Sequence, residues 1–243
     1  MDTIEQFDSH VMQTYDRLPL VMESGSGRTC TDEDGKRYLD FGSGIGTNSL
    51  GYCDPAWADA VCAQVRSMQH TSNYYYTKVQ ADFAERLCQI TGYKRVFFGN
   101  SGAEANECAI KLARKYSFDK YGAGRNVIIT LRNSFHGRTM ATLSATGQDC
   151  FHNYFFPFPE GFVYAEANDI DDLLKKMHNN VCAVMLEYIQ GEGGVVPLDS
   201  KYVDQLYDFC AKRDILVIAD EVQTGVGRTG TFLAGEQYAK KAD

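Results

Sequence analysis

The sequence has no hydrophobic run of the roughly 20 residues that a membrane-spanning helix requires. Its first residues, MDTIEQFDSHVMQTYD, are too acidic and polar for a secretory signal peptide. Basic residues are in the minority, since 24 Lys and Arg face 32 Asp and Glu and the net charge is -8. The sequence therefore lacks the broad basic field that attracts nucleic acid. These absences predict a cytoplasmic protein with neither a membrane nor a nucleic acid as partner.

Metal-ligand spacing is also missing, although the sequence contains eight cysteines. No C-x-x-C pair occurs and no two histidines lie close together, so we expect no metal site. Several cysteines, such as Cys108 and Cys182, stand where a small apolar residue suits the interior of a helix or strand. We expect them to be reduced thiols of a core in a reducing compartment.

Low-complexity tracts, internal repeats and flexible linkers are absent, so no separate tethered domains are expected. Residues 1–55 are rich in glycine and turn signals, and the Asp34-Gly35 pair in TCTDEDGKRYLDF predicts a hairpin between short strands. From residue 56 to residue 243 the pattern changes to alternating helices and strands. We expect the boundary between two parts of the protein at this change.

Five amphipathic helices alternate with short apolar runs in residues 56–243. The helices are expected at 57–68, 79–90, 103–121, 170–178 and 202–213, and the strands at 95–99, 126–131, 161–165, 182–189 and 215–219. Apolar runs that do not alternate with polar residues suit strands that are buried on both faces. The predicted fold class is therefore α/β, a mainly parallel sheet with helices on both faces. Ligands of such sheets bind beyond the carboxyl ends of the strands.

The first polar cluster at a predicted strand end is NSGAEAN, residues 100–106. Ser101 and Glu104 have the spacing of a capping box, and Gly102 and Ala103 are small enough for an anion to reach the free N–H groups of the first helical turn. A phosphate fits this description. A well-capped helix with no ligand fits it equally.

The second cluster is Phe135-His-Gly-Arg138, where an aromatic face for stacking on a planar ring stands beside a guanidinium group that can bind a carboxylate. The alternatives are a core phenylalanine, a surface ion pair and a structural histidine at position 136. The third cluster is Asp220-Glu221, which follows directly on an apolar strand. A carboxylate at a buried strand end needs a cationic partner or hydrogen-bond donors, although a helix cap or salt bridge also supplies them.

A fourth strand end carries Glu187 and Glu192, with glycines that keep the loop tight. Together the four clusters describe a site for a phosphorylated, planar heterocycle that can be protonated, and pyridoxal 5'-phosphate is the candidate cofactor. A competing interpretation is a dinucleotide-binding turn, because Gly225, Gly227 and Gly230 match G-x-G-x-x-G. That turn must follow its strand directly, whereas here five residues intervene, so an NAD-dependent oxidoreductase is disfavoured.

Four ordered motifs resemble the class III, fold type I, aminotransferases: NSGAEANECAIKLARK, SFHGRTMATLSATG, LEYIQGEGGV and ADEVQTGVGRTG. The likeness is greatest to the acetylornithine branch of that family, and RTCTDEDGKRYLDFGSGIGTNSLGY and SNYYYTKVQ extend it over nearly the whole chain. It implies that residues 1–55 belong to a small domain. Residues 56–243 would then form the cofactor-binding large domain, cut short before the lysine that carries the cofactor.

The resemblance also implies roles for individual residues. Gly102 and Ala103 would hold the cofactor phosphate through backbone N–H groups. Phe135 would stack on one face of the pyridine ring and Val222 would pack against the other. Asp220 would bind the ring nitrogen, which makes it the one catalytic residue that the motifs assign.

Four further positions take part by the same resemblance. Gln223 would reach the phenolic oxygen of the cofactor, and Glu221 would support the turn. Arg138 would bind the α-carboxylate of the amino acid through two parallel hydrogen bonds. Glu192 resembles an acid that pairs with a distant arginine and adjusts the pocket between the two half-reactions.

The implied reaction transfers the terminal amino group of N2-acetylornithine to 2-oxoglutarate, as in arginine biosynthesis, and the family's dimers suggest a homodimer. Succinylornithine, ornithine and other ω-amino substrates are alternatives. Lys240 and Lys241 lie in what reads as a solvated helix end with no following glycines, so neither is assigned as the cofactor-carrying lysine. The chain is therefore expected to be a fragment, inactive alone, with a naturally short non-catalytic relative as the alternative. Tyr188 stands where the family usually has proline.

Overall fold

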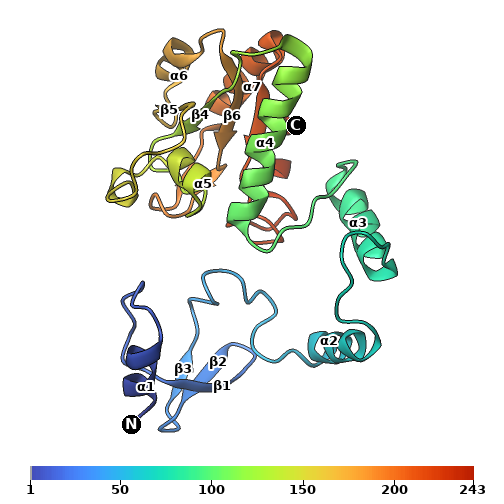
Figure 1. Cartoon of the computed structure of the whole chain (residues 1–243), viewed down its shortest axis with the longest axis vertical. Helices are drawn as coiled ribbons and strands as arrows, with labels where there is room; N and C mark the ends of the chain where they lie inside the picture. The colour runs from blue at the N-terminus through green and yellow to red at the C-terminus, as the bar shows by residue number, and fades with distance from the viewer. Residues whose placement is uncertain (1) are drawn as a thin grey trace. The chain divides into compact units, whose positions relative to one another are not determined.

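The computed structural model describes residues 2–243 and falls into two compact units, the first ending at Tyr76 and the second running from Thr77 to Asp243 (Figure 1). The division between the two units therefore lies after Tyr76. The expected boundary after residue 55, and the assignment of residues 1–55 to a small domain, stay predictions.

The first unit contains a three-stranded antiparallel sheet in the order β1-β2-β3. Its elements are α1 (Thr3–His10), β1 (Met22–Ser26), β2 (Thr29–Asp32), β3 (Arg37–Leu39) and α2 (Pro55–Ser67). The predicted hairpin at Asp34-Gly35 is confirmed, because Gly35 has φ +81° and β2 and β3 pair on either side of the turn. The buried carboxylate of Asp32 fixes the turn by accepting the N–H groups of Asp34 and Lys36.

The second unit is a four-stranded parallel sheet with helices on both faces, so the predicted fold class is confirmed (Figure 1). The strand order is β5-β4-β6-β9. The strands are β4 (Val127–Leu131), β5 (Phe162–Ala165), β6 (Val181–Leu186) and β9 (Leu216–Ala219), and a short antiparallel pair, β7 (Ile189–Gln190) with β8 (Val196–Pro197), follows β6. The helices are α3 (Lys78–Thr91), α4 (Gly102–Tyr121), α5 (Met140–Ala145), α6 (Ile170–Lys176) and α7 (Ser200–Arg213), with short 3-10 helices η1 (Asp149–Phe151) and η2 (Ala234–Gln237).

Side chains alternate between two hydrophobic clusters on the two faces of the sheet, as strand geometry requires. On one face Ala183 and Met185 of β6 pack with Ile110 of α4. On the other face Val184 and Leu186 pack with residues of α6 and α7 such as Leu173 and Leu206. All six residues of β6 are buried, so β6 forms the centre of the core.

One expected strand is wrong. Residues 95–99 form no strand, and Phe97 in this segment is 62% exposed. An apolar run favours an extended backbone, but a strand exists only where a neighbour pairs with it. No strand in the described part of the chain pairs with these residues, and Phe98 stacks instead on Phe83 of α3 with ring centroids 5.8 Å apart.

Tyr188, at the position where the resemblance implies proline, lies in the core after β6. Its side chain is 1% exposed and its hydroxyl lies 2.6 Å from the hydroxyl of Tyr207. Its ring stacks on Tyr238 with centroids 4.7 Å apart. The hydrogen bond from the Leu198 N–H to the Tyr188 carbonyl, 2.9 Å, shows that the loop still closes without proline.

Residues 2–243 contain neither a helix that could span a membrane nor a cluster of metal-ligating side chains. No helix there combines the length and apolar character needed to cross a bilayer. No group of three or more His, Cys, Asp and Glu side chains there is arranged to hold a metal ion. The eight cysteines are free thiols, and Cys30, Cys182 and Cys210 are buried.

Candidate active site

Polar side chains gather where three of the parallel strands end. Asp220 follows β9, Glu187 follows β6, and the loop containing Phe135 follows β4. Because parallel strands all point the same way, their carboxyl ends share one edge of the sheet, where ligands of such folds bind. The N-terminus of α4 joins them there, because Asn106 bonds to Asp220.

Asp220 accepts three hydrogen bonds at this edge and is only 5% exposed. Its Oδ2 accepts hydrogen bonds from Asn106 Nδ2 at 2.7 Å and from His136 Nδ1 at 2.8 Å. Its Oδ1 accepts the N–H of Val222 at 3.0 Å. Burial raises the pKa of Asp220, but the interactions with His136, Val222 and Asn106 outweigh burial, so the pKa lies below the usual value. Asp220 is therefore an anion in a buried site.

His136 faces Asp220 and not the solvent, since its side chain has no exposed surface. The Asp220 carboxylate accepts, so the Nδ1 of His136 carries the proton in this contact. The backbone carbonyl of His136 accepts a second bond from Asn106 Nδ2 at 2.8 Å. The Nε2 of His136 is buried and has no hydrogen-bond partner among the described residues. Asn106 thus ties the aspartate and the histidine loop to α4.

Two glycines allow the segments of the site to meet. A Cβ on Gly102 would lie 2.7 Å from both methyl carbons of Val222, so α4 begins directly against the Asp220 segment. A Cβ on Gly137 would lie 2.7 Å from the Cβ of Ala103. Side chains at either position would push these segments apart.

The predicted capping box is half formed. Ser101 Oγ accepts the N–H of Glu104 at 3.1 Å, as predicted. Glu104 does not return the bond to Ser101, and its Oε2 accepts the N–H of Asn100 at 2.6 Å instead. The N–H groups of Gly102 and Ala103 belong to the first turn of a 20-residue helix, where no intrahelical acceptor exists.

Substitution of Gly137 by alanine is expected to destabilise the second unit by about 2 kcal/mol or more. The residue has φ +131° and no space for a methyl group. Gly194 is the matched control, because it has φ +110° but open space around the position of a Cβ. Urea denaturation should show a larger loss of unfolding free energy for Gly137→Ala than for Gly194→Ala. Equal losses would mean that backbone strain alone, and not the contact with α4, matters at position 137.

Phe135 and Arg138 lie beside a second aromatic ring, that of Phe151. The Phe135 and Phe151 rings meet edge to face, with centroids 5.8 Å apart. The guanidinium carbon of Arg138 lies 4.1 Å from the Phe151 centroid and 5.6 Å from that of Phe135. Arg138 is exposed and forms no salt bridge with any residue in the described range 2–243. The rings orient the guanidinium while its N–H groups stay open to a carboxylate.

The residues after Asp220 point in different directions. Glu221 turns away toward η2, where its Oε2 accepts the N–H of Ala234 at 2.5 Å and its Oε1 accepts that of Gly235 at 2.9 Å. Val222 is 60% exposed and leans on Gly102. The Gln223 side chain lies against the backbone of Gly191, where a Cβ would be 2.2 Å from Gln223 Oε1.

Glu192 is separate from the buried group. It is exposed in the turn between β7 and β8 and takes part in no salt bridge within residues 2–243. The structure places it two residues beyond Gln190, which is buried and bonded to the carbonyl of Arg132 at 2.8 Å. The arrangement leaves the Glu192 carboxylate open to a cationic partner.

The glycines of the G-x-G-x-x-G match do not form a dinucleotide turn. Gly227 and Gly230 have φ +86° and +99° in a run of turns. The element that follows them in the described chain is the short 3-10 helix η2, not the α-helix whose N-terminus would bind a pyrophosphate. The geometry therefore opposes the oxidoreductase interpretation.

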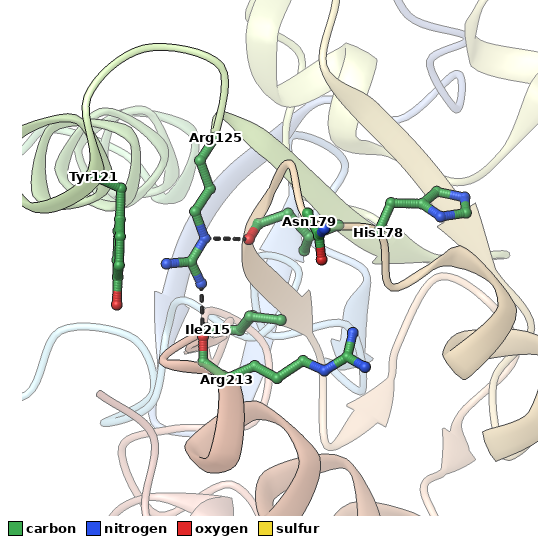
Figure 2. Close-up of a pocket in the computed structure, with 7 residues that line it drawn as sticks. Tyr121, Arg125, His178, Asn179, Arg213 and Ile215 are labelled. Carbon is green, nitrogen blue, oxygen red and sulfur yellow. Dashed lines mark hydrogen bonds between the residues drawn. The ribbon is translucent and has the colours of Figure 1, made fainter.

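Figure 2 shows a pocket lined by residues at the amino ends of β6 and β9. Asp220 follows the carboxyl end of β9, so the pocket lies at the other end of the strands. Its volume is about 490 Å³, and it is lined by Tyr121, Arg125, His178, Asn179, Val181, Arg213 and Ile215. Arg125 donates from Nε to the Val181 carbonyl at 2.9 Å and from Nη2 to the carbonyls of Arg213 and Asp214 at 2.9 and 2.8 Å. Arg125 therefore holds the strand starts together, and the pocket lies away from Asp220.

We expect Arg125→Ala to lower the free energy of unfolding by about 2 kcal/mol, because three carbonyl groups lose a charged donor. The control is Arg95→Ala, since Arg95 is exposed. Urea titration of both variants measures the difference. A shift of the same size in the control would assign the effect to lost charge and not to the three hydrogen bonds.

Comparison with known proteins defines the family. A family model described as "Aminotransferase class-III" matches residues 11–243. The chain belongs to the class-III aminotransferases. It is 53% identical over its whole length to an acetylornithine aminotransferase of Haemophilus ducreyi, of which it covers 62%. It is 47% identical over 96% of its length to one of Caldanaerobacter subterraneus, of which it covers 60%.

Solved structures of this family share the fold. The ornithine aminotransferase of Toxoplasma gondii superposes with a TM-score of 0.94 at 32% identity, and the match covers 99% of this chain and 57% of that one. The N-acetylornithine aminotransferase of Stenotrophomonas maltophilia gives a TM-score of 0.83 at 36% identity, covering 99% and 59%. The chain thus spans about 60% of the length of the curated relatives it matches.

Class-III aminotransferases depend on pyridoxal phosphate, and the same cofactor applies to this member of the family. The predicted family and cofactor are therefore confirmed. The roles of individual site residues stay predictions, although the structure brings Gly102, Ala103, Phe135, Asp220, Val222 and Gln223 to one sheet edge.

Two residues that bond to Asp220 have no assigned role from the sequence, Asn106 and His136. The sequence places Asn106 at the end of the polar cluster of residues 100–106 and favours a structural histidine at position 136. The signal in the sequence for Asn106 is its place in α4, five positions after the cap residue Ser101, where a polar side chain is buried. The partner of either residue is distant in the sequence, Asp220 lying 114 positions from Asn106 and 84 from His136.

Proposed function

We propose that the protein of which this chain forms part transfers the terminal amino group of N2-acetylornithine to 2-oxoglutarate. The names of the curated relatives support this substrate, since all of those described above are acetylornithine aminotransferases, and further ones reach 43–48% identity. The structural observation that carries the reaction class is the buried anion of Asp220, bonded by His136 and Asn106 at the carboxyl ends of the strands.

The residues present fit pyridoxal phosphate in charge and in shape. An aspartate whose pKa lies below its usual value remains ionised and can pair with a protonated ring nitrogen. The N-terminus of α4 offers N–H groups without intrahelical acceptors to a phosphate. Gly102 has no side chain of its own, and Val222 packs against the position that a Cβ would occupy.

In this proposal Gly102 and Ala103 would hold the phosphate, and Phe135 and Val222 would pack against the ring. Asp220 keeps the ring nitrogen protonated. His136 and Asn106 keep the Asp220 carboxylate oriented, because both donate to the same oxygen, Oδ2. When bound, the protonated cofactor supplies an electron sink for the substrate carbon that loses its proton.

Substrate binding is assigned to the exposed side of the site. Arg138, oriented by Phe151, binds a substrate carboxylate with two parallel hydrogen bonds. Gln223 donates to the phenolic oxygen of the cofactor. Glu192 adjusts the pocket for the two substrates, and Glu221 acts indirectly by holding the turn at η2.

The lysine that carries the cofactor is proposed to lie in the part of the relatives' length that this chain does not match. Lys240 donates to Asp208 and to the Asp204 carbonyl on α7. Lys241 donates to the Thr91 carbonyl at 2.7 Å and lies over the Tyr93 ring. Both amines are engaged elsewhere. We further propose that residues 1–243 alone are inactive, and that the whole protein is a cytoplasmic homodimer.

The test is an amino-transfer assay of the whole protein with N2-acetylornithine, N2-succinylornithine and ornithine at equal concentration, each with 2-oxoglutarate. The proposal expects the largest kcat/KM for N2-acetylornithine. Preference for ornithine is the second candidate, favoured by the TM-score of 0.94 with the Toxoplasma enzyme. Absence of glutamate formation with all three would refute both and support a non-catalytic relative.

A further inference from the structure

Glu187 is a buried carboxyl group to which the proposed reaction gives no role. It follows β6 directly and is 4% exposed. Its Oε2 accepts the backbone N–H of Phe135 at 3.0 Å, and its Oε1 accepts that of Gly191 at 3.4 Å. One side chain therefore bonds to two loops that leave different strands.

Other contacts join the same two loops. Gln190 Nε2 donates to the Arg132 carbonyl at 2.8 Å. Gly193 lies so close to the carbonyl of Asn133 that a Cβ would be 2.6 Å from it. The loops after β4 and β6 thus contact each other at several residues, and Glu187 is the ionisable residue among them.

Both ends of the Glu187 contact lead to the cofactor pocket. Phe135 is the residue proposed to stack on the ring. Gly191 lies directly behind Gln223, whose Cδ would be 2.8 Å from a Cβ at position 191. A shift of Gly191 would therefore move the Gln223 amide.

We propose that Glu187 is a positioning residue that sets the Phe135 ring and the Gln223 amide at a common spacing for pyridoxal phosphate. This inference rests on the proposed function for its ligand. The structural basis of the inference is independent of the proposed function, because the two hydrogen bonds of Glu187 form within the protein itself.

The chemistry of the carboxylate explains why glutamate serves here. Two N–H groups point at two acceptor oxygens, one on each. Glutamine has the same shape but only one acceptor oxygen, so one backbone N–H would face an amide NH₂ group. Glu187→Gln is therefore a nearly isosteric variant that breaks one of the two bonds. Glu160→Gln is the control, because Glu160 is exposed in the same unit.

The first measurement is amide hydrogen exchange of Phe135 and Gly191 by NMR on the 243-residue chain at pH 8. Loss of a charge-assisted bond should speed exchange of at least one of these amides about 10-fold in Glu187→Gln and leave Glu160→Gln unchanged. Unchanged exchange at both amides would overturn the inference.

The second measurement is the dissociation constant of pyridoxal 5'-phosphate in the whole protein. Glu187→Gln should bind about 10-fold more weakly, and Glu160→Gln should match the wild type. Equal affinity of Glu187→Gln and the wild type would overturn the positioning role. If the wild type binds no pyridoxal phosphate, the proposed function fails, whereas the exchange data still decide whether Glu187 ties the loops.

A third measurement covers the case in which Glu187→Gln does not fold. In the wild type the amide shifts of Phe135 and Gly191 should follow the titration of the Glu187 carboxyl carbon. The charged neighbours that face Glu187 are His136 and Asp220, so their titrations are recorded in the same experiment. Amide shifts that follow His136 or Asp220 and not Glu187 would contradict the inference.

Discussion

Asp220→Asn is expected to lower kcat for amino transfer in the whole protein by about 10³-fold, which corresponds to roughly 4 kcal/mol of activation free energy. Asparagine keeps the size of the side chain but removes the negative charge that holds the ring nitrogen protonated. It also places an NH₂ group among the donors Asn106 Nδ2, His136 Nδ1 and the Val222 N–H. Steady-state kinetics with the preferred amino donor measures the effect.

The matched control is Asp171→Asn, which removes one negative charge from an exposed position of α6. We expect this control to retain the kcat of the wild type. A circular dichroism spectrum and urea curve of Asp220→Asn should show that the fold persists. Turnover of a folded Asp220→Asn variant within 10-fold of the wild type would reject the assignment of Asp220 to the ring nitrogen.

The second large effect expected is on the pH dependence of stability. Burial raises the pKa of Glu187 to about 7, and the negative charge of Asp220 adds to the rise. The unfolded state ionises near 4.5, so between pH 4.5 and 7 the folded state binds more protons than the unfolded state. The contribution of Glu187 to stability is thus fully present below pH 4.5 and is lost as the pH rises through 7.

Over that window the loss approaches about 3 kcal/mol, since each pKa unit corresponds to about 1.4 kcal/mol. Glu187→Gln cannot titrate. The unfolding free energy of the wild type minus that of the variant should therefore fall from pH 4.5 to 7 and then level off. Urea unfolding of the 243-residue chain at pH 5, 6, 7 and 8 measures this difference. A difference that rises with pH would show that the folded-state pKa of Glu187 is lowered.

The secondary structure of the second unit follows closely from the pattern of residues. The expected helix at 103–121 begins one residue earlier, at Gly102, because Ser101 caps it. The run 126–131 forms β4, buried on both faces as a non-alternating apolar strand requires. These elements were predictable because hydrophobic period and capping are local properties of the chain.

The segment 95–99 marks the limit of local reasoning. Its composition is that of a strand, but strand formation depends on a neighbour whose distance in sequence no local pattern encodes. The same limit applies at the site. Asp220 and Glu187 were recognised as strand-end carboxylates, yet their different states were not predictable. Asp220 receives two side-chain donors and is held ionised, whereas Glu187 receives only backbone N–H groups and has a raised pKa.

The class-III family, the α/β fold and the candidate cofactor residues can be recognised from the sequence, because motifs and periodicity are carried by residues close together in the chain. Which of these residues are in contact is visible only in the folded protein. Asn106, His136 and Asp220 meet across as many as 114 positions, and Glu187 reaches Phe135 across 52. Such contacts arise when parallel strands bring their carboxyl ends to one edge, and they lower the pKa of Asp220 whereas burial raises that of Glu187.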